Sequence, residues 1–426
     1  MSTAPTTQLR LLATRRLLPL FVAQFFGAVN DNLFKNALII LIAYRDTSNA
    51  RATEILVTLA GAIFILPYFL FSAPAGQIAD KFEKRTLVRI VKLWEIGIML
   101  VAAAGFMLNN IYFQLAVLFG LGVQATFFGP VKYAIIPELL APEELIGGNA
   151  LIEAGTFLAI LIGTIAGGLL ILAPHGYLVV TAALLVMALI GWSAAFFLPP
   201  GRAASPGLRL EPNIFAETWR ILTYAYARAD LRMPLIGISW FWFLGIAYLA
   251  QFPNFAKEIL HADNEVVTLF LTLFSVGIGA GSLLCGRIQK GVVNARLVPL
   301  GALGLTIFGL DFWLAGEPEG SAAALIGAVP FLLNPVNWRI VVDLFVIALA
   351  GGLYCVPLYA LMQVRSETAH RARVVAANNI MNALFMVVAG IASAAMLAAG
   401  WGIASIFLAI GIGNAIVTVA MWKTAR

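Results

Sequence analysis

The sequence has few charged residues for its length. Only 11% of its 426 residues are charged, 61% are hydrophobic, and the net charge is +6. A soluble domain carries about 25% charged residues, because such side chains cover its surface in water. The composition therefore excludes a soluble enzyme and a nucleic-acid-binding protein. It also excludes a disordered chain, which needs low apolar content and high net charge.

Cysteine and histidine are equally scarce. The two cysteines, Cys285 and Cys355, lie far apart in apolar runs, so they form neither a disulfide framework nor metal-ligand spacing. The three histidines, His175, His261 and His370, are also far apart. No glycine-rich phosphate-binding loop ending in lysine occurs. We therefore expect no catalytic site, no metal, no cofactor and no ATP-driven transport.

Long apolar runs, in contrast, are abundant. A membrane-spanning helix needs about 20 mostly apolar residues. We expect twelve such helices, over residues 17–44, 54–73, 87–108, 111–131, 149–173, 177–198, 233–256, 266–286, 297–315, 340–362, 374–398 and 401–422. The protein is thus predicted to be an all-α membrane protein that crosses the bilayer twelve times.

The basic residues are distributed unevenly between the two sides of these spans. Of the 27 Lys and Arg residues, 21 fall on the side of the N-terminus and 4 on the other side. Loops that stay in the cytoplasm are enriched in Lys and Arg. We therefore predict that both termini are cytoplasmic.

The chain divides into two similar halves. We expect a six-helix bundle over residues 1–198, a cytoplasmic linker over 199–232 and a second six-helix bundle over 233–426. A glycine-led basic loop follows the second span of each half, at Gly76 and at Gly286. Two six-helix halves with parallel repeats are typical of major facilitator transporters, in which the substrate lies between the halves.

The linker becomes amphipathic after Asn213. Phe215, Trp219, Leu222 and Tyr226 fall on one face of a helix. This pattern predicts a helix lying on the cytoplasmic membrane surface. A linker helix packed against the bundle would explain it equally well.

A loop motif supports the same fold. The stretch Gly76-x-x-x-Asp80-Lys81-x-x-Lys84-Arg85 resembles the loop motif of the major facilitator superfamily, with Glu83 where glycine is usual. This motif indicates the superfamily but no substrate. We expect Asp80, Lys84 and Arg85 to lock a cytoplasmic gate rather than to contact substrate.

Further motifs are more specific. They are Gln24-Phe-Phe-Gly-Ala-Val-Asn30-Asp31-Asn32, Gly129-Pro130-Val131-Lys132-Tyr133-Ala-Ile-Ile-Pro-Glu138-Leu, Asn149-Ala-Leu-Ile-Glu153-Ala and Val356-Pro357-Leu-Tyr-Ala-Leu-Met-Gln363. Together they resemble the bacterial lysophospholipid transporter family across nearly the whole chain. The aromatic run Ser239-Trp-Phe-Trp242 is closer to relatives that are fused to lipid-modifying enzymes.

The resemblance implies a function. Members of this family move lysophospholipids, chiefly lysophosphatidylethanolamine, from the outer to the inner leaflet of the inner membrane. An acyltransferase/acyl-carrier-protein synthetase then re-acylates them. The resemblance therefore implies a lysophospholipid substrate, contact with membrane lipids and an acyltransferase/acyl-ACP synthetase as partner, and no enzyme activity of the chain itself.

Charged residues inside the spans are the strongest site candidates, because each costs about 2.5–3.5 kcal/mol on insertion scales. Asp31 lies halfway along the first span between Asn30 and Asn32. Its carboxylate could bind an ammonium headgroup, and we favour this role. Alternatively it pairs with Lys35, four residues later on the same face. Lys35 in turn could bind the lipid phosphate.

Other candidates follow the fourth span and open the fifth. Lys132, with Tyr133, follows a Gly-Pro pair and could bind phosphate, extend to the headgroups or pair with Glu138. Glu153 lies one turn after Asn149, so both face the same way, toward substrate or toward a neighbouring helix.

The second half has polar residues in its spans but no charge in their middle. The candidates are Gln251, Gln363, Asn378 and Asn382. Asn378 and Asn382 lie one turn apart, and hydrogen bonding between helices explains at least one of them. A charged first half would hold a headgroup, whereas an apolar second half would accommodate an acyl chain.

Two other functions are compatible with the sequence. One is a proton-coupled exporter of drugs or small amphiphiles, with Asp31 or Glu153 as proton carrier. The other is a membrane anchor or scaffold for a phospholipid acyltransferase. Alternating-access transport of lysophospholipids is the hypothesis that we favour.

Overall fold

The computed structural model describes residues 8–45, 50–108, 110–316 and 325–424. It contains twelve helices long and apolar enough to cross a membrane, which confirms the predicted number. The first six are α1 (Leu18–Arg45), α2 (Ala50–Lys81), α3 (Lys84–Met107), α4 (Ile111–Leu139), α5 (Leu145–Leu172) and α6 (Gly176–Ala195). The last six are α8 (Ala229–Asn254), α9 (Asn264–Gln289), α10 (Leu297–Ala315), α12 (Trp338–Arg365), α13 (Arg371–Ala398) and α14 (Ile403–Thr424).

Shorter elements connect these spans. They are η1 (Gln8–Ala13), η2 (Pro142–Glu144), α7 (Ile214–Ala227), η3 (Phe255–Ile259), α11 (Ala328–Leu333), η4 (Pro335–Asn337) and η5 (Thr368–His370). The described residues form no strand, only one isolated bridge between Ala262 and Ile326. The fold is therefore all-α, as predicted.

The outer surface of the bundle is apolar. Large side chains such as Leu169 and Ile391 are 67% and 64% exposed. A helix that is apolar all round requires an apolar environment on every side. Lipid supplies it on the outer face, and the facing helices supply it on the inner face.

The fourth span is longer than predicted. The apolar run predicts an end at residue 131, whereas α4 continues to Leu139 with Pro130 and Pro137 inside it. Proline is tolerated in spanning helices because neighbouring groups satisfy the freed backbone carbonyls. Lys132 and Tyr133 therefore lie inside the helix and not at its end.

Several predicted starts fall a few residues inside the observed helices, and two of these affect candidate residues. α5 begins at Leu145 and so includes Asn149 in its second turn. α13 begins at Arg371, which places Asn378 two turns inside it. At α13 the basic first turn conceals the true start from an apolar-run criterion.

Close backbone packing joins the helices within each half. A Cβ atom on Gly163 of α5 would lie 2.5 Å from the carbonyl oxygen of Val29 in α1. One on Gly277 of α9 would lie 2.8 Å from the carbonyl oxygen of Phe345 in α12. Small residues let spanning helices approach in this way.

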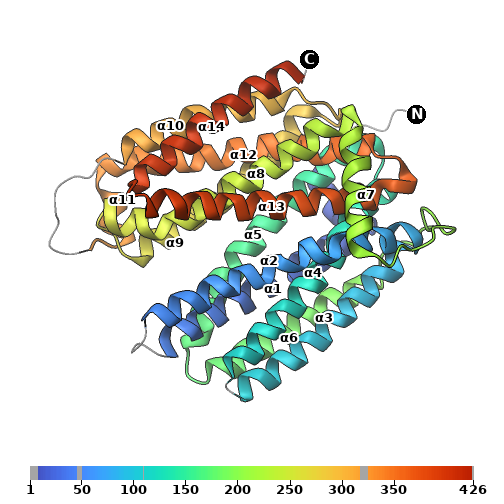
Figure 1. Ribbon diagram of the computed structural model, residues 1–426, viewed down its shortest axis with the longest axis horizontal. Helices are drawn as coiled ribbons and strands as arrows, with labels where there is room; N and C mark the ends of the chain where they lie inside the picture. The colour runs from blue at the N-terminus through green and yellow to red at the C-terminus, as the bar shows by residue number, and fades with distance from the viewer. Residues whose placement is uncertain (1–7, 46–49, 109, 317–324, 425–426) are drawn as a thin grey trace.

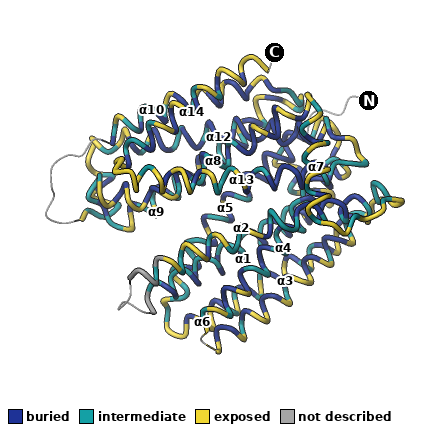
Figure 2. Tube along the Cα trace, viewed as in Figure 1, coloured by how far each residue is buried: buried dark blue, intermediate teal, exposed yellow. Residues whose placement is uncertain are grey.

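The two halves meet at one end of the molecule (Figure 1). Across the boundary, α13 packs against α2 and α5 packs against α9. Figure 1 shows the halves close together near α7 and diverging toward the end that carries α11. Buried positions gather along the facing helices near α7, whereas exposed ones line the outer surface (Figure 2). We call the two ends of the bundle the α7 end and the α11 end.

The amphipathic segment of the linker forms α7 (Ile214–Ala227). It packs against α2, α8 and α13, and its side chains Glu217 and Ile221 are buried there. Of the predicted apolar face, Phe215 and Trp219 are 78% and 75% exposed, whereas Leu222 and Tyr226 are half-buried and pack against the core. The helix is thus packed on the bundle and also presents an apolar outer face. Its position on a membrane surface stays a prediction.

Candidate functional site

Four charged residues within the apolar runs of the first half, away from the basic loop motif, have no ion-pair partner in the described part of the chain. They are Asp31 and Lys35 on α1, Lys132 on α4 and Glu153 on α5. The charge of Lys132 interacts with those of both Asp31 and Glu153. An uncompensated buried charge is costly, and ionisable residues within spans mark substrate or ion pathways. This group is therefore the first candidate for function.

Asp31 and Lys35 do not form the intrahelical ion pair that their spacing allows. Lys35 Nζ instead donates a hydrogen bond of 3.1 Å to Asn32 Oδ1 and lies 5.6 Å from the centroid of the Phe64 ring. Asp31 is half-buried, and its Oδ1 atom is buried without a hydrogen-bond partner. Its carboxylate is left available for a ligand.

Asn30 belongs to a different network, in which its Nδ2 is bonded and its Oδ1 is buried without a partner. Its Nδ2 donates to Glu95 Oε1 at 3.0 Å, and Glu95 Oε2 accepts from Lys92 Nζ at 2.6 Å and from Gln124 Nε2 at 3.1 Å. All four side chains are at most 2% exposed. Each charge here is paired and hydrogen-bonded, as buried charges need to be. In this conformation Asn30 holds α1 to α3 and leaves ligand contact to its neighbours.

A chain of contacts links Glu153 to the second half. Tyr133 donates its hydroxyl hydrogen to Glu153 Oε1 at 2.6 Å, and the Tyr133 ring stacks on Tyr359 of α12 with centroids 4.5 Å apart. Trp242 Nε1 of α8 donates to the Tyr359 hydroxyl at 3.2 Å. Lys132 Nζ lies 4.4 Å from the Tyr133 ring centroid, a cation–π distance. The charged group of the first half therefore adjoins an aromatic surface of the second half.

That aromatic surface continues along α5 and α8. The ring of Phe157 lies 5.9 Å from Phe241 and 6.2 Å from Trp242, measured between centroids. Phe157 comes from the first half and the other two rings from the second. The boundary between the halves thus holds apolar rings beside unpaired charges.

Asn149 and Gln363 form a reciprocal amide pair between the halves. Asn149 Nδ2 donates to Gln363 Oε1 at 2.8 Å, and Gln363 Nε2 donates to Asn149 Oδ1 at 2.9 Å. Both side chains are 0% exposed. Because these donors and acceptors already satisfy one another, the pair closes the boundary in this conformation and presents no free group to a ligand.

The other three candidates of the second half do not join one cluster of contacts. Asn382 Oδ1 accepts from Ser239 Oγ at 2.9 Å, which connects α13 to α8. Asn378 is 0% exposed, and neither atom of its amide has a partner. Gln251 Oε1 is likewise buried without one. The helix-to-helix hydrogen bond expected for one of the two asparagines is present at Asn382.

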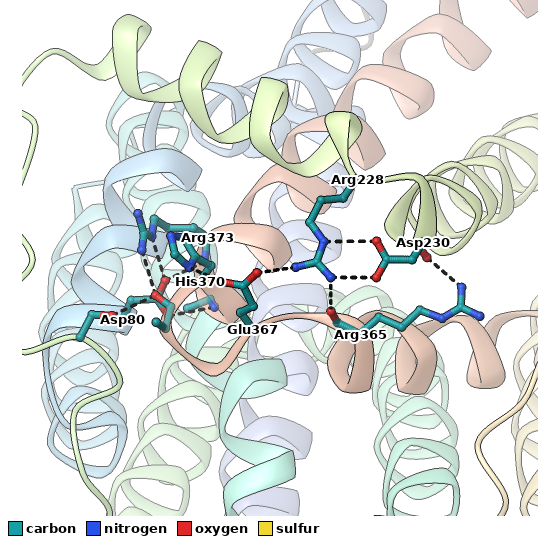
Figure 3. Close-up of polar contacts among 10 residues, drawn as sticks. Asp80, Arg228, Asp230, Arg365, Glu367, His370 and Arg373 are labelled. Carbon is teal, nitrogen blue, oxygen red and sulfur yellow. Dashed lines mark hydrogen bonds and ion pairs between the residues drawn. The ribbon is translucent and has the colours of Figure 1, made fainter.

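Asp80, the penultimate residue of α2, connects the two halves at the α7 end (Figure 3). Its Oδ1 accepts from the backbone N–H of Ala372 at 3.0 Å, and its Oδ2 accepts from Arg373 Nε at 3.0 Å. These groups open α13, so the carboxylate also faces the positive end of a helix dipole. Asp80 is 0% exposed, and the donors that bind its carboxylate all belong to the second half.

The basic residues of the loop motif have other partners than expected. Lys84 Nζ pairs with Glu138 at 2.7 Å inside the first half. Arg85 forms no ion pair with any described residue, and its Nε is buried without a partner. The cation that binds Asp80 is therefore Arg373 of the second half and not Arg85.

Comparison with known proteins settles the family. The chain matches the Major Facilitator Superfamily over residues 20–334. It belongs to that superfamily. Lysophospholipid transporter LplT of Escherichia fergusonii is 28% identical over 420 residues, which cover 95% of this chain and 94% of that protein. LplT of Serratia proteamaculans is 28% identical over 361 residues, covering 84% and 82%. The resemblance that the motifs indicate is thus confirmed.

Solved structures of the superfamily share the fold. The human organic anion transporter MFSD10 superposes with a TM-score of 0.75 at 16% identity, covering 97% of this chain and 99% of that one. A bacterial homologue of the iron transporter ferroportin in an outward-facing state has a TM-score of 0.70 at 13% identity, with 96% and 100% covered. At these identities the likeness concerns architecture alone.

In a major facilitator fold the substrate site lies near the midplane, between the halves. Asp31 lies in the middle of α1, and the contacts of Tyr133, Tyr359 and Trp242 cross the boundary between the halves. The superfamily assignment and the unpaired charges therefore indicate the same region of the molecule.

Sequence reasoning missed three residues of this arrangement. Tyr359 lies within the quoted motif that begins at Val356, two residues after its proline, and Trp242 lies in the aromatic run of α8. Both residues lie in motifs that the sequence shows, but aromatic residues in a span usually face lipid or neighbouring helices. Their place at the boundary between the halves was therefore not predicted. In the sequence, Arg373 is only one of the basic residues that indicate orientation. Its partner Asp80 is 293 residues away, so the contact between them has no local signal.

Proposed function

We propose that this protein transports lysophospholipids, with Asp31, Lys35, Lys132 and Glu153 receiving the headgroup. A lysophosphatidylethanolamine headgroup carries one ammonium and one phosphate. Two carboxylates and two ammonium side chains without ion-pair partners match that pair of charges. Charge-assisted hydrogen bonds are stronger than neutral ones, so the headgroup would offset the cost of the buried charges. This observation carries the proposal.

The aromatic surface between the halves would accept the acyl chain. Phe157, Phe241 and Trp242 pack together at the boundary. Trp242 is connected to Glu153 through Tyr359 and Tyr133. Each buried methylene contributes about 0.8 kcal/mol. A single long chain would therefore supply much of the affinity, and the names of the curated relatives are consistent with a one-chain lipid.

The direction of transport depends on which end of the bundle is closed and on which side of the membrane that end lies. The α7 end holds the contacts of Asp80 and of the amide pair and is closed, whereas the halves diverge toward the α11 end (Figure 1). The positive-inside bias supports a cytoplasmic position for the α7 end. The conformation would then accept lipid from the outer leaflet and release it to the inner leaflet by alternating access, where an acyltransferase/acyl-ACP synthetase re-acylates it. The chain itself has no enzymatic step in this scheme.

Leaflet translocation of labelled lysophosphatidylethanolamine in proteoliposomes tests the proposal. We expect uptake that depends on the protein and falls at least about tenfold in Asp31→Asn. Movement of drugs but not of lysolipid, driven by a proton gradient, would instead establish the exporter. Absence of any transport, with an acyltransferase co-purifying, would establish the scaffold.

A further inference from the structure

A second site lies at the α7 end, apart from the charges of the central site. A cavity of about 160 Å³ is lined by Arg220, Ile221, Tyr224, His370 and Arg373. It lies between α7 and the start of α13. Most of the exposed lining is apolar, and the two guanidinium groups and the imidazole contribute its few polar atoms.

The basic side chains that line this cavity have unused donors. Arg220 uses Nε and Nη2 to bind Glu217. Arg373 uses Nε to bind Asp80 and Nη2 to bind the carbonyl oxygen of Ala369. The Nη1 group of each has no partner in the part of the chain that the structure describes. A guanidinium has five N–H donors, so both can bind an anion while they keep their present partners.

The third polar group, His370, is placed similarly. Its ring stacks on Tyr224 at 4.7 Å between centroids, and its Nδ1 lies 3.4 Å from Glu367 (Figure 3). Its Nε2 has no described partner. The first backbone N–H groups of α13 already bind Asp80. The side chains of the cavity therefore supply the donors for an anion.

The depth of the cavity indicates the source of that anion. The span α2 ends beside the cavity at Lys81, and the span α13 begins there at Arg371. Because spans end near the membrane surface, the cavity lies at the level of lipid headgroups. Phe215 and Trp219, on the outer face of α7, are 78% and 75% exposed. Aromatic side chains concentrate at the interface between membrane and water. We propose that this cavity binds the phosphate of an anionic phospholipid, whose chains run beside the exposed aromatic face of α7.

Such a lipid would connect three elements. Arg220 belongs to α7, Arg373 belongs to α13, and Arg373 also holds Asp80 at the end of α2. A phosphate shared by the two guanidinium groups would tie the linker helix to the contact that closes the α7 end. The bound lipid would therefore stabilise the conformation seen here.

The experiment titrates purified full-length protein in a neutral detergent with diacyl phosphatidylglycerol or diacyl phosphatidylcholine and measures the melting temperature. The test variant is Glu217→Gln/Arg220→Gln. It removes the arginine together with its partner, so that no buried carboxylate is left without an ion pair. Arg220→Lys is a second variant, which keeps the charge pair but loses the planar guanidinium group with its additional N–H donors. Arg209→Gln removes the same charge from an exposed position of the linker outside the cavity and is the matched control.

We expect phosphatidylglycerol to raise the melting temperature of the wild type and of Arg209→Gln more than phosphatidylcholine does. The half-saturating concentration should rise about tenfold or more in both Arg220 variants, because a charge-assisted contact is lost. An equal response of all four proteins, or of the wild type to both lipids, would overturn the proposal. So would inorganic phosphate that reproduces the whole shift, since the ligand would then be a free anion.

Discussion

Asp31→Asn separates a ligand-binding carboxylate from a structural one. The substitution preserves size and hydrogen bonding and removes only the charge. The carboxylate has no ion-pair partner within the described ranges, and its Oδ1 is buried without a hydrogen bond. The native fold therefore loses no described ion pair or hydrogen bond when the charge is removed, and the melting temperature should change little.

Transport should respond differently. If the carboxylate binds an ammonium group, the lost charge-assisted contact is worth about 1.5–3 kcal/mol. At 1.4 kcal/mol for each factor of ten, uptake should fall about ten- to a hundredfold. The assay is the initial rate of labelled lysophosphatidylethanolamine uptake into proteoliposomes, at a substrate concentration below the KM and normalised to inserted protein.

Glu95→Gln is the matched contrast. It also removes one carboxylate from the first half, but it leaves Lys92, which is 1% exposed, without its partner at 2.6 Å. Breaking a buried pair costs about 3–5 kcal/mol, so this variant should lose yield and melting temperature. Full uptake by Asp31→Asn, or a loss of stability like that of Glu95→Gln, would refute the headgroup role.

Three further predictions concern the gate, the linker helix and the substrate. Asp80→Asn should weaken closure of the α7 end, and a cysteine introduced there should then react faster with a water-soluble maleimide; unchanged labelling and transport would leave the motif as a topology signal only. Burial raises the pKa of Glu217 although Arg220 opposes the shift, so the folded state binds a proton more tightly than the unfolded state. Stability should therefore fall as pH rises from about 4.5 through that raised pKa, and Glu217→Gln should remove this slope in melting curves. Lysophospholipids should compete for uptake, glycerophosphoethanolamine should compete poorly, and diacyl lipids should move slowly; equal rates for one-chain and two-chain lipids would contradict the single chain site.

The spans were predictable because their signal is local. Twenty apolar residues in succession need no tertiary information to be recognised as a helix that crosses a membrane. The ends were less predictable, as α4 illustrates. A lysine at position 132 looks like the end of an apolar run, yet the helix continues to Leu139. A charged side chain that faces the interior of the bundle can lie within a span, and the direction it faces is a tertiary property.

The same distinction applies to the site. Asp31, Lys35, Lys132 and Glu153 were recognisable as charges within apolar runs, whereas their lack of ion-pair partners was not. By sequence alone Lys35 is as good a partner for Asp31 as Glu95 is for Lys92. In the structure only the second pair forms, because Asn30 and Gln124 complete the hydrogen bonds around Glu95. Whether a buried charge is satisfied depends on residues from several helices.

The contrast between satisfied and unsatisfied charges explains how one bundle can be both stable and mobile. Lys92 and Glu95 are paired within the first half, so their contacts persist when the halves move relative to each other. Asp80, Asn149 and Tyr133 instead contact Arg373, Gln363 and Tyr359 of the second half. Opening the α7 end must break these contacts, and a ligand can shift the equilibrium only by binding the two conformations differently. A headgroup that reaches Glu153 would compete with its hydrogen bond from Tyr133, at 2.6 Å, and would thereby disturb the ring that stacks on Tyr359. Ligand binding and opening of the closed end would then share the same side chains, as alternating access requires.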